Sequence, residues 1–160
     1  APDVVARDGG ISMLYQRHAA SGHYELFLAH SRDGINFEPV VEAPVFSPAP
    51  DGWDSHDVVT GRLIQSGDCF YLFYGGSATL VDQPAAFGLA RSMDLIHWER
   101  HQGNPVFSCG PEGSEDAGAI WFPSLIETEE AFVLLYEGSR GNYSGELSSQ
   151  ICMAWIRRVL

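Results

Sequence analysis

Apolar and polar positions recur in the same order three times along the chain. Each copy holds two short apolar runs separated by a polar turn, and each closes on a tyrosine that stands thirteen residues after an anchor position. Two short apolar runs around a polar turn are typical of a β-hairpin. The copies, each given as anchor, turn and tyrosine, are Pro2, Asp8-Gly9 and Tyr15; Gly61, Gly67-Asp68 and Tyr74; and Pro123, Glu129-Glu130 and Tyr136.

Two further strands are predicted after the first two hairpins. Residues 26–38 return as residues 87–99, each time as two apolar runs around a Ser-x-Asp turn, and a Pro-Val-Phe segment ends both copies at the same offset of 61 residues. A repeated unit of about 60 residues with four short strands is typical of a propeller blade. The turn residues Asp33 and Asp94 can accept backbone N–H bonds at the tip of each turn, so we predict a structural role for them.

The predicted fold class is therefore all-β: a partial β-propeller of about two and a half four-stranded antiparallel blades in a single unit, residues 1–160. The blades are predicted at residues 1–46, at 53–107 and, incomplete, at 115–160. Propellers close from about 4 to 8 blades around a channel, and a repeat unit cannot bury its apolar face alone. We therefore expect a homodimer or higher homo-oligomer that closes a ring.

Composition narrows the choice of partners. The chain has 21 acidic residues against nine arginines, no lysine and a net charge of −12, which argues against nucleic-acid binding. No apolar run approaches the roughly 18 residues of a membrane-spanning helix, so we expect a soluble protein without a membrane segment, in the cytoplasm or secreted. Cys69, Cys109 and Cys152 form no CxxC pair and have no metal-ligand spacing, so we expect no metal and no cofactor.

The candidate catalytic residues are three aspartates that lie upstream of the anchors. Asp54 and Asp116 both stand seven residues before an anchor. A repeated carboxylate has two interpretations, because it can cap a loop in every blade or supply paired acids to one channel. His56 and Asp57 have no counterpart in the third blade, where Gly118 and Ala119 stand at the matching positions, so nothing in the repeat requires them. We therefore regard these two as better functional candidates than any repeated residue.

Other side chains are candidates for binding a substrate. The aromatic faces of Trp53 and Trp121 suit the apolar C–H surface of a sugar ring, although the side chain of Trp121 is equally suited to a core. Arg62, Glu137 and Arg140 stand near the ends of predicted strands that would line a channel. If these residues do not bind substrate, we expect them to form surface ion pairs, which contribute little to stability.

Longer phrases of the sequence resemble a known superfamily. The strand Ala1-Pro2-Asp3-Val4-Val5, the run Phe70-Tyr71-Leu72-Phe73-Tyr74-Gly75-Gly76 and the segment Asp94-Leu95-Ile96-His97-Trp98-Glu99 are similar to scaffold phrases of five-bladed propeller glycoside hydrolases. These are the family 43 arabinanase and β-xylosidase type and the related levanase, invertase and mannoside phosphorylase type. The resemblance implies a carbohydrate substrate and cleavage of a glycosidic bond by carboxylates that rise from different blades.

The sequence departs from the family pattern at the positions where the acids are expected. In family 43 the base is an Asp directly before the inner-strand Pro of the first blade, and the acid is a Glu at a similar place in a later blade. Ala1, Thr60 and Phe122 stand before the three anchors here. Three explanations follow: a relative that uses the upstream Asp54, Asp57 and Asp116 as its acids, part of a longer enzyme, or a carbohydrate-binding or self-assembling module without hydrolase activity.

Overall fold

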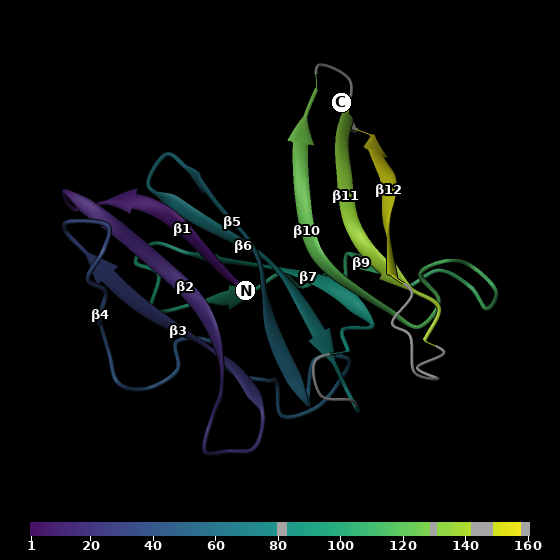
Figure 1. The fold of residues 1–160 in the computed structure, drawn as a ribbon, viewed down its shortest axis with the longest axis horizontal. Helices are drawn as coiled ribbons and strands as arrows, with labels where there is room; N and C mark the ends of the chain where they lie inside the picture. Colours follow the sequence, from purple (N-terminus) through teal and green to yellow (C-terminus); the bar gives the residue numbers. More distant parts are fainter. Residues whose placement is uncertain (80–82, 129–130, 142–148, 158–160) are drawn as a thin grey trace.

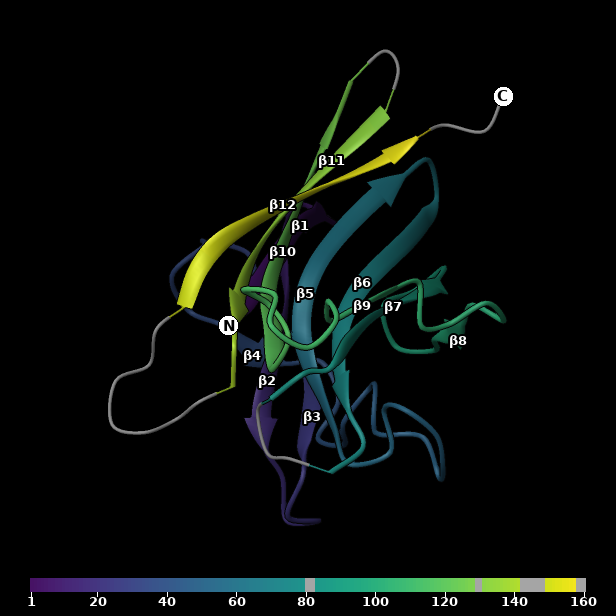
Figure 2. The ribbon, with the colours of Figure 1, turned by 90° about the vertical axis from the view of Figure 1, so that its right-hand side faces the viewer.

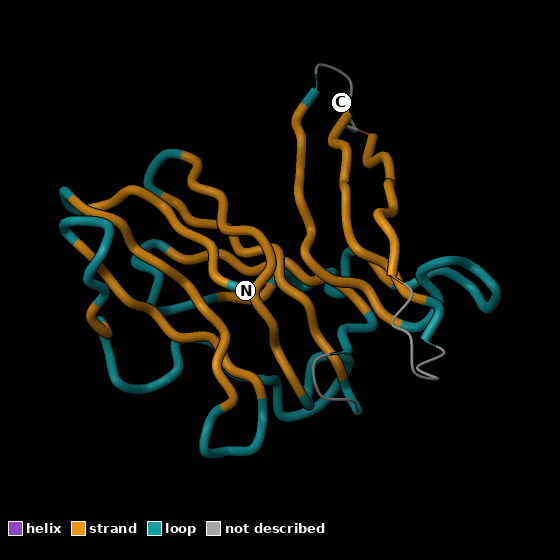
Figure 3. The backbone as a smooth tube through the Cα atoms, in the orientation of Figure 1, coloured by secondary structure: helices purple, strands orange, loops and turns teal. Residues whose placement is uncertain are grey.

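The chain consists of strands and loops. The computed structural model describes residues 1–79, 83–128, 131–141 and 149–157, and within these ranges it contains twelve strands and no helix, hence none that could cross a bilayer (Figures 1 and 3). The strands form three antiparallel sheets that follow one another along the sequence. The all-β class and the division into blade-like sheets are as predicted.

The first sheet has four strands in the order of the sequence. Its first two strands are joined by the two-residue turn Asp8-Gly9, whose φ angles of 52° and 74° both lie in the left-handed region. Tight hairpin turns require this conformation, which is why a glycine follows the aspartate. The strands are β1 (Pro2–Arg7), β2 (Gly10–His18), β3 (Tyr24–Ser31) and β4 (Glu38–Pro39).

The second sheet has five strands where four were predicted. The additional short strand comes from the Pro-Val-Phe segment, in which Phe107 pairs with Phe87 of the third strand of the blade. Four of its strands lie side by side in sequence order, and the fifth pairs with β7. The strands are β5 (Asp57–Ser66), β6 (Cys69–Ser77), β7 (Ala86–Ser92), β8 (Glu99–Arg100) and β9 (Phe107–Ser108).

The third sheet has three described strands, consistent with the predicted incomplete blade. They are β10 (Ala119–Glu127), β11 (Ala131–Ser139) and β12 (Ser149–Arg157), and β11 lies between the other two. The predicted turn at Glu129-Glu130 lies outside the described residues. Figure 1 shows this sheet, in green and yellow, standing beside the teal second sheet.

The middle sheet packs against a neighbour on each face. Leu72 of β6 is fully buried in a core that it shares with Leu14 of the first sheet. The next residue, Phe73, belongs to a second core that contains Leu134 of the third sheet. Successive side chains of a strand point to opposite faces. One strand therefore serves both interfaces, and each outer sheet packs on the middle one with one face only.

The first strands of the three sheets lie next to one another. Strand β5 contacts both β1 and β10, and the three run close together near the middle of Figure 2. The carboxylate of Asp3 in β1 accepts a hydrogen bond of 2.7 Å from the backbone N–H of Leu63 in β5. Adjacent first strands are what a propeller requires, since they line its central channel.

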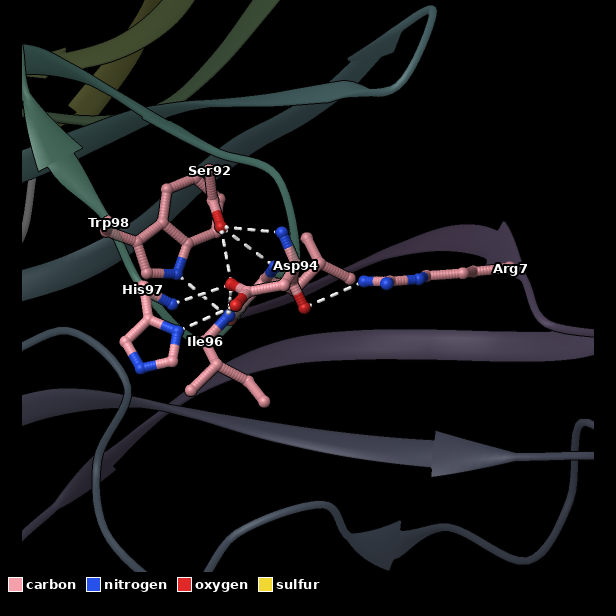
Figure 4. A network of polar contacts seen from close by, with 7 residues as sticks. Arg7, Ser92, Asp94, Ile96, His97 and Trp98 are labelled. Atoms are coloured by element: carbon pink, nitrogen blue, oxygen red, sulfur yellow. Dashed lines mark hydrogen bonds and ion pairs between the residues drawn. The ribbon is translucent and has the colours of Figure 1, made fainter.

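The Ser-x-Asp turns have the structural role predicted for them. In the second sheet the Asp94 carboxylate accepts hydrogen bonds from the backbone N–H groups of Ile96 and His97, both at 2.8 Å (Figure 4). The His97 ring lies 2.7 Å from the same carboxylate, and Arg7 of the first sheet donates to the Asp94 carbonyl at 2.7 Å. Asp33 binds the equivalent N–H groups in the first sheet. These turns close the outer edge of the first and second blades.

Candidate functional site

Asp54 lies buried at the interface between the first and second sheets. Its carboxylate accepts hydrogen bonds from the Tyr74 hydroxyl at 2.9 Å and from the Arg100 guanidinium at 2.8 Å, and the residue is 2% exposed. Arg100 also donates to the Ser47 carbonyl at 2.6 Å, and its guanidinium lies 4.2 Å from the centre of the Phe46 ring. Burial, followed by the neighbouring Asp54 charge, raises the pKa of Tyr74 far above its ordinary value.

Asp116 repeats this arrangement between the second and third sheets. Its carboxylate accepts hydrogen bonds of 2.7 Å from the Tyr136 hydroxyl and from the Ser114 hydroxyl. Burial raises the pKa of Asp116, but these hydrogen bonds to the ionised form outweigh burial and leave the pKa below its usual value. The aspartate and the tyrosine are 20 residues apart in both copies.

The Asp–Tyr pair accounts for two of the three recurring tyrosines. Each hydroxyl crosses from the second strand of a blade to the loop that precedes the blade, and it donates a hydrogen bond to a buried carboxylate that Arg100 or Ser114 also contacts. These contacts support the loop-capping interpretation of Asp54 and Asp116. The two carboxylates also belong to different blade interfaces, since Tyr74 and Tyr136 lie in separate core clusters.

His56 and Asp57, the two candidates without a repeat counterpart, lie together with a second histidine. Asp57 begins β5 and is 1% exposed, and its Oδ2 atom lies 3.2 Å from the His56 Nδ1 atom. The ring of His23, from the turn between β2 and β3, meets the His56 ring edge to face, with 4.9 Å between ring centres. One ligand-capable atom from each of the three residues lies within 4.8 Å of the other two.

Sequence reasoning did not single out His23. It is 33 residues from His56, and nothing local connects the two residues. The criterion used for His56, the absence of a counterpart in another blade, would have found it. Pro84 stands 61 residues after His23, so the repeat does not require a histidine at this position. The backbone N–H of Tyr24, the residue after His23, donates to Asp57 Oδ1 at 2.6 Å and brings the two segments together.

Trp53 is held in the packing of the middle sheet. Its ring stacks on the Tyr74 ring at 5.5 Å, and it packs against the core between the first two sheets. A Cβ atom at Gly76 or Gly88 would lie 2.5 or 2.6 Å from the Trp53 ring. The two glycines therefore make room for the indole, and this contact favours a packing role over sugar stacking for Trp53.

The remaining predicted binding residues lie at separate places on the strands. Arg62 in β5 pairs with Asp3 at 3.4 Å and has a side chain 50% exposed, and Arg140 pairs with Glu115. Trp121 in β10 pairs across the sheet with Glu137 in β11. Arg62 and Arg140 therefore each form an ion pair, which is the structural role considered for them from the sequence.

The second and third anchors, Gly61 and Pro123, mark β-bulges in the inner strands. The pairing of β5 shifts register between Val59 and Arg62, and that of β10 shifts between Trp121 and Ser124. Phe122 lies at the second bulge with a φ of 50° and an exposure of 55%. Bulges redirect side chains and often occur beside active sites. Phe122 is therefore an exposed aromatic side chain on an inner strand, directly before the anchor.

A surface hollow on the second sheet lies away from these residues. It has a volume of about 340 Å³, and its described lining includes Tyr71, Arg91, Glu99 and His101 but none of the three predicted acids. It opens on the outer strands β7 and β8, whereas Asp57 begins the inner strand β5. We place the candidate site at the cluster of His23, His56 and Asp57 because titratable side chains converge there.

Comparison with solved structures agrees with this fold. A family 32 β-fructofuranosidase of Bombyx mori matches 97% of the chain at a TM-score of 0.70 and 22% identity, and the match covers 33% of the enzyme. A thermostable family 43 glycoside hydrolase matches 99% of the chain at a TM-score of 0.64 and 22% identity, over 53% of its own length. An N-acetylgalactosamine deacetylase from F. plautii matches 98% of the chain at a TM-score of 0.65 and 16% identity, over 49% of its length.

These matches define the class of the fold. The chain has the propeller fold of the glycoside hydrolases, as its sequence phrases suggested, and it spans about a third to about half of the length of the structures it matches. No protein-family model matches the sequence, and no curated protein matches it. At these identities the likeness concerns the fold, and the function has to be argued from the site.

Proposed function

We propose that this chain acts on carbohydrate as part of a complete propeller and cleaves a glycosidic bond. The observation that carries the proposal is the arc of three sheets, which matches glycoside hydrolases over nearly its whole length. The candidate site supports it, since ionisable side chains converge at the start of the inner strand β5. Glycosidases place their carboxylates around such a channel.

Among the three candidate acids, we assign the reaction to Asp57, with His56 as its neighbour. Asp54 and Asp116 accept hydrogen bonds from tyrosine hydroxyls at the blade interfaces, so we assign them a structural role in holding the blades together. We further assign the binding of sugar to the inner-strand positions Phe122 and Trp121. Cleavage requires a second carboxylate near Asp57, and another part of the closed ring would supply it.

The test is the hydrolysis of a panel of aryl glycosides by the Asp57→Asn variant. General acid–base catalysis contributes about 10²–10⁴-fold in rate, so turnover should fall by at least about 100-fold. The matched control is Asp51→Asn, which alters an exposed aspartate in the loop before the blade and should leave turnover unchanged. Full activity in Asp57→Asn would contradict the assignment.

A second candidate function is a carbohydrate-binding module without catalysis. The observation that favours it is the structural use of the repeated acids, together with Ala1, Thr60 and Phe122 at the positions directly before the anchors. Calorimetry with oligosaccharides separates the two functions. Binding without cleavage of any aryl glycoside supports the module, whereas cleavage that depends on Asp57 supports the enzyme.

We also propose that a second copy of the chain completes the ring. The face of the third sheet that points away from the second sheet is apolar and exposed: on β12, Ile151 is 83% exposed, Met153 57% and Trp155 62%. The alternate residues Cys152 and Ala154 pack against the middle sheet. Apolar patches of more than a few hundred Å² are rare on monomers. The chain spans 33% of the length of one structural neighbour and 53% of another. Two copies would therefore span about two thirds to all of the length of these neighbours.

Light scattering at micromolar concentration tests this association. The unaltered chain should have the mass of at least two copies, and Met153→Glu should lower it to that of one, because the charge would be buried in the contact. Ile35→Glu is the matched control: Ile35 is 81% exposed, but it lies in the Ser-x-Asp turn of the first sheet. A monomeric mass for the unaltered chain would contradict the proposal.

A further inference from the structure

We propose that His23, His56 and Asp57 bind a divalent transition-metal cation such as Zn²⁺ at the interface of the first and second sheets. One ligand atom from each residue lies within 4.8 Å of the other two. His23 comes from the turn between β2 and β3, and the other two residues come from the start of β5. The inference goes beyond the proposed function, because it holds whether or not the chain cleaves a sugar.

The distances suit a tetrahedral cation. Zn–N and Zn–O bonds of about 2.0–2.2 Å at tetrahedral angles place neighbouring ligand atoms about 3.3–3.6 Å apart. The distance between His56 Nδ1 and Asp57 Oδ2 is 3.2 Å, close to this separation. With all three atoms within 4.8 Å, the ring of His23 needs to move by only about 1 Å to complete the geometry.

Two buried nitrogen atoms at this place lack a partner. Among the described residues, neither His23 Nδ1 nor His56 Nδ1 has a hydrogen-bond partner, although both atoms are shielded from solvent. The contact of His56 Nδ1 with Asp57 therefore has the distance of an ion pair without the alignment of a hydrogen bond. Buried polar groups are nearly always satisfied. A cation that accepts the lone pairs of both nitrogens would satisfy them together.

The surrounding hydrogen bonds hold the ligands in place. The Tyr24 backbone N–H donates to Asp57 Oδ1 at 2.6 Å, which fixes the carboxylate with Oδ2 beside His56. The His56 backbone N–H donates to the Ser77 carbonyl at 2.8 Å. Supporting hydrogen bonds of this kind orient metal ligands and raise affinity. The His56 side chain is 28% exposed, so its ring reaches the surface although its Nδ1 atom is shielded from solvent.

The ligand set selects the class of cation. Imidazole nitrogen suits zinc, copper, nickel and iron, whereas calcium and magnesium prefer six or more oxygen ligands. Two histidines and one carboxylate therefore favour a transition metal. Three protein ligands leave one position of a tetrahedral cation for a further ligand.

The test is calorimetric titration of the full chain with Zn²⁺ alone, without carbohydrate. We expect one ion per chain, and we expect Co²⁺ bound at the same place to show the visible absorption of a tetrahedral complex. His23→Asn and His56→Asn should each lower the affinity by at least about 100-fold, because loss of a supporting residue alone costs about 10–100-fold. Asp57→Asn should weaken Zn²⁺ binding in the same way. His23 lies in the turn between β2 and β3, so its variant keeps the test valid if Asp57→Asn does not fold.

The matched control is His97→Asn. His97 lies 2.7 Å from Asp94 and forms another histidine–aspartate contact, but its side chain is 85% exposed. This variant should bind Zn²⁺ as the unaltered chain does. The proposal is overturned if the chain binds no Zn²⁺, if His23→Asn binds it with full affinity, if His97→Asn weakens it equally, or if Ca²⁺ competes equally. Because Asp57 is also assigned to the reaction, glycosidase activity is measured separately, with and without Zn²⁺, and the Zn²⁺ titration tests the cation site by itself.

Discussion

Replacing Arg100 with Met should destabilise the protein by about 3 kcal/mol, because the change leaves the Asp54 carboxylate buried without its cation. Asp54 is 2% exposed, and the distance from its Oδ2 to Arg100 Nε is 2.8 Å. Methionine is unbranched like the aliphatic stem of arginine, so the variant removes the guanidinium with its charge, its hydrogen bonds and its contact with the Phe46 ring.

The magnitude follows from the environment of the two charges. Removing one partner of a buried ion pair costs about 3–5 kcal/mol. The lower end applies here, because the Arg100 side chain is 32% exposed and the carboxylate keeps its hydrogen bond from Tyr74. Adding Asp54→Asn to Arg100→Met should recover part of the loss, since the buried group is then neutral. Coupling energies between contacting residues are about 0.5–3 kcal/mol.

The assay is urea unfolding at fixed protein concentration, followed by the intrinsic fluorescence of the four tryptophans, among them Trp53, whose ring stacks on Tyr74 at 5.5 Å. Arg91→Met is the matched control, because Arg91 binds Glu99 at 2.8 Å with both side chains more than 60% exposed. An exposed pair should contribute far less. A loss for Arg100→Met as small as that for Arg91→Met would refute the reasoning that burial makes the Asp54 pair important.

Two further predictions concern the other carboxylates. Tyr136→Phe should cost about 1.5–3 kcal/mol in urea unfolding, because it removes a hydrogen bond to the ionised Asp116, while the same change at the partly exposed Tyr15 should cost less. The side-chain and backbone hydrogen bonds of His97 hold the pKa of Asp94 well below its ordinary value of about 3.9. Its ionised form therefore stabilises the fold fully above that ordinary value, and this contribution is lost as the pH falls through the lowered pKa. Asp94→Asn should be less stable than the unaltered chain at pH 7, with a difference that shrinks in acid; a pH-independent difference would contradict the linkage.

Much of the fold could be predicted because its determinants are local. The residues Asp8-Gly9 predict a hairpin, because both readily adopt the left-handed backbone that its tight turn requires. In each Ser-x-Asp turn, the aspartate accepts hydrogen bonds from backbone N–H groups within three residues. Alternation of side chains along a strand is likewise a property of a few consecutive residues. The extra strand β9 was not predicted, since its pairing with Phe87 depends on how a loop returns to the sheet.

The candidate site could be predicted only in part. The absence of a repeat counterpart pointed to His56 and Asp57 as residues that the blade pattern does not explain, and the structure places both beside His23. It left the repeated acids open, because a carboxylate that caps a loop and one that serves a channel look alike in sequence. The hydrogen bonds from the hydroxyls of Tyr74 and Tyr136 favour the loop-capping interpretation, and each tyrosine is 20 residues from its aspartate.

The sequence by itself determined the repeat, the strand order and the propeller class, because hydrophobic periodicity and turn chemistry act over a few residues. The tertiary structure decided which side chains meet across sheets. Arg100 reaches Asp54 over 46 residues of sequence, and His23 meets His56 over 33. Such contacts depend on how whole sheets twist and pack against one another, which no local pattern encodes. For the same reason, the repeated tyrosines were visible at once in the sequence, whereas the cluster of two histidines and an aspartate became visible only in the folded chain.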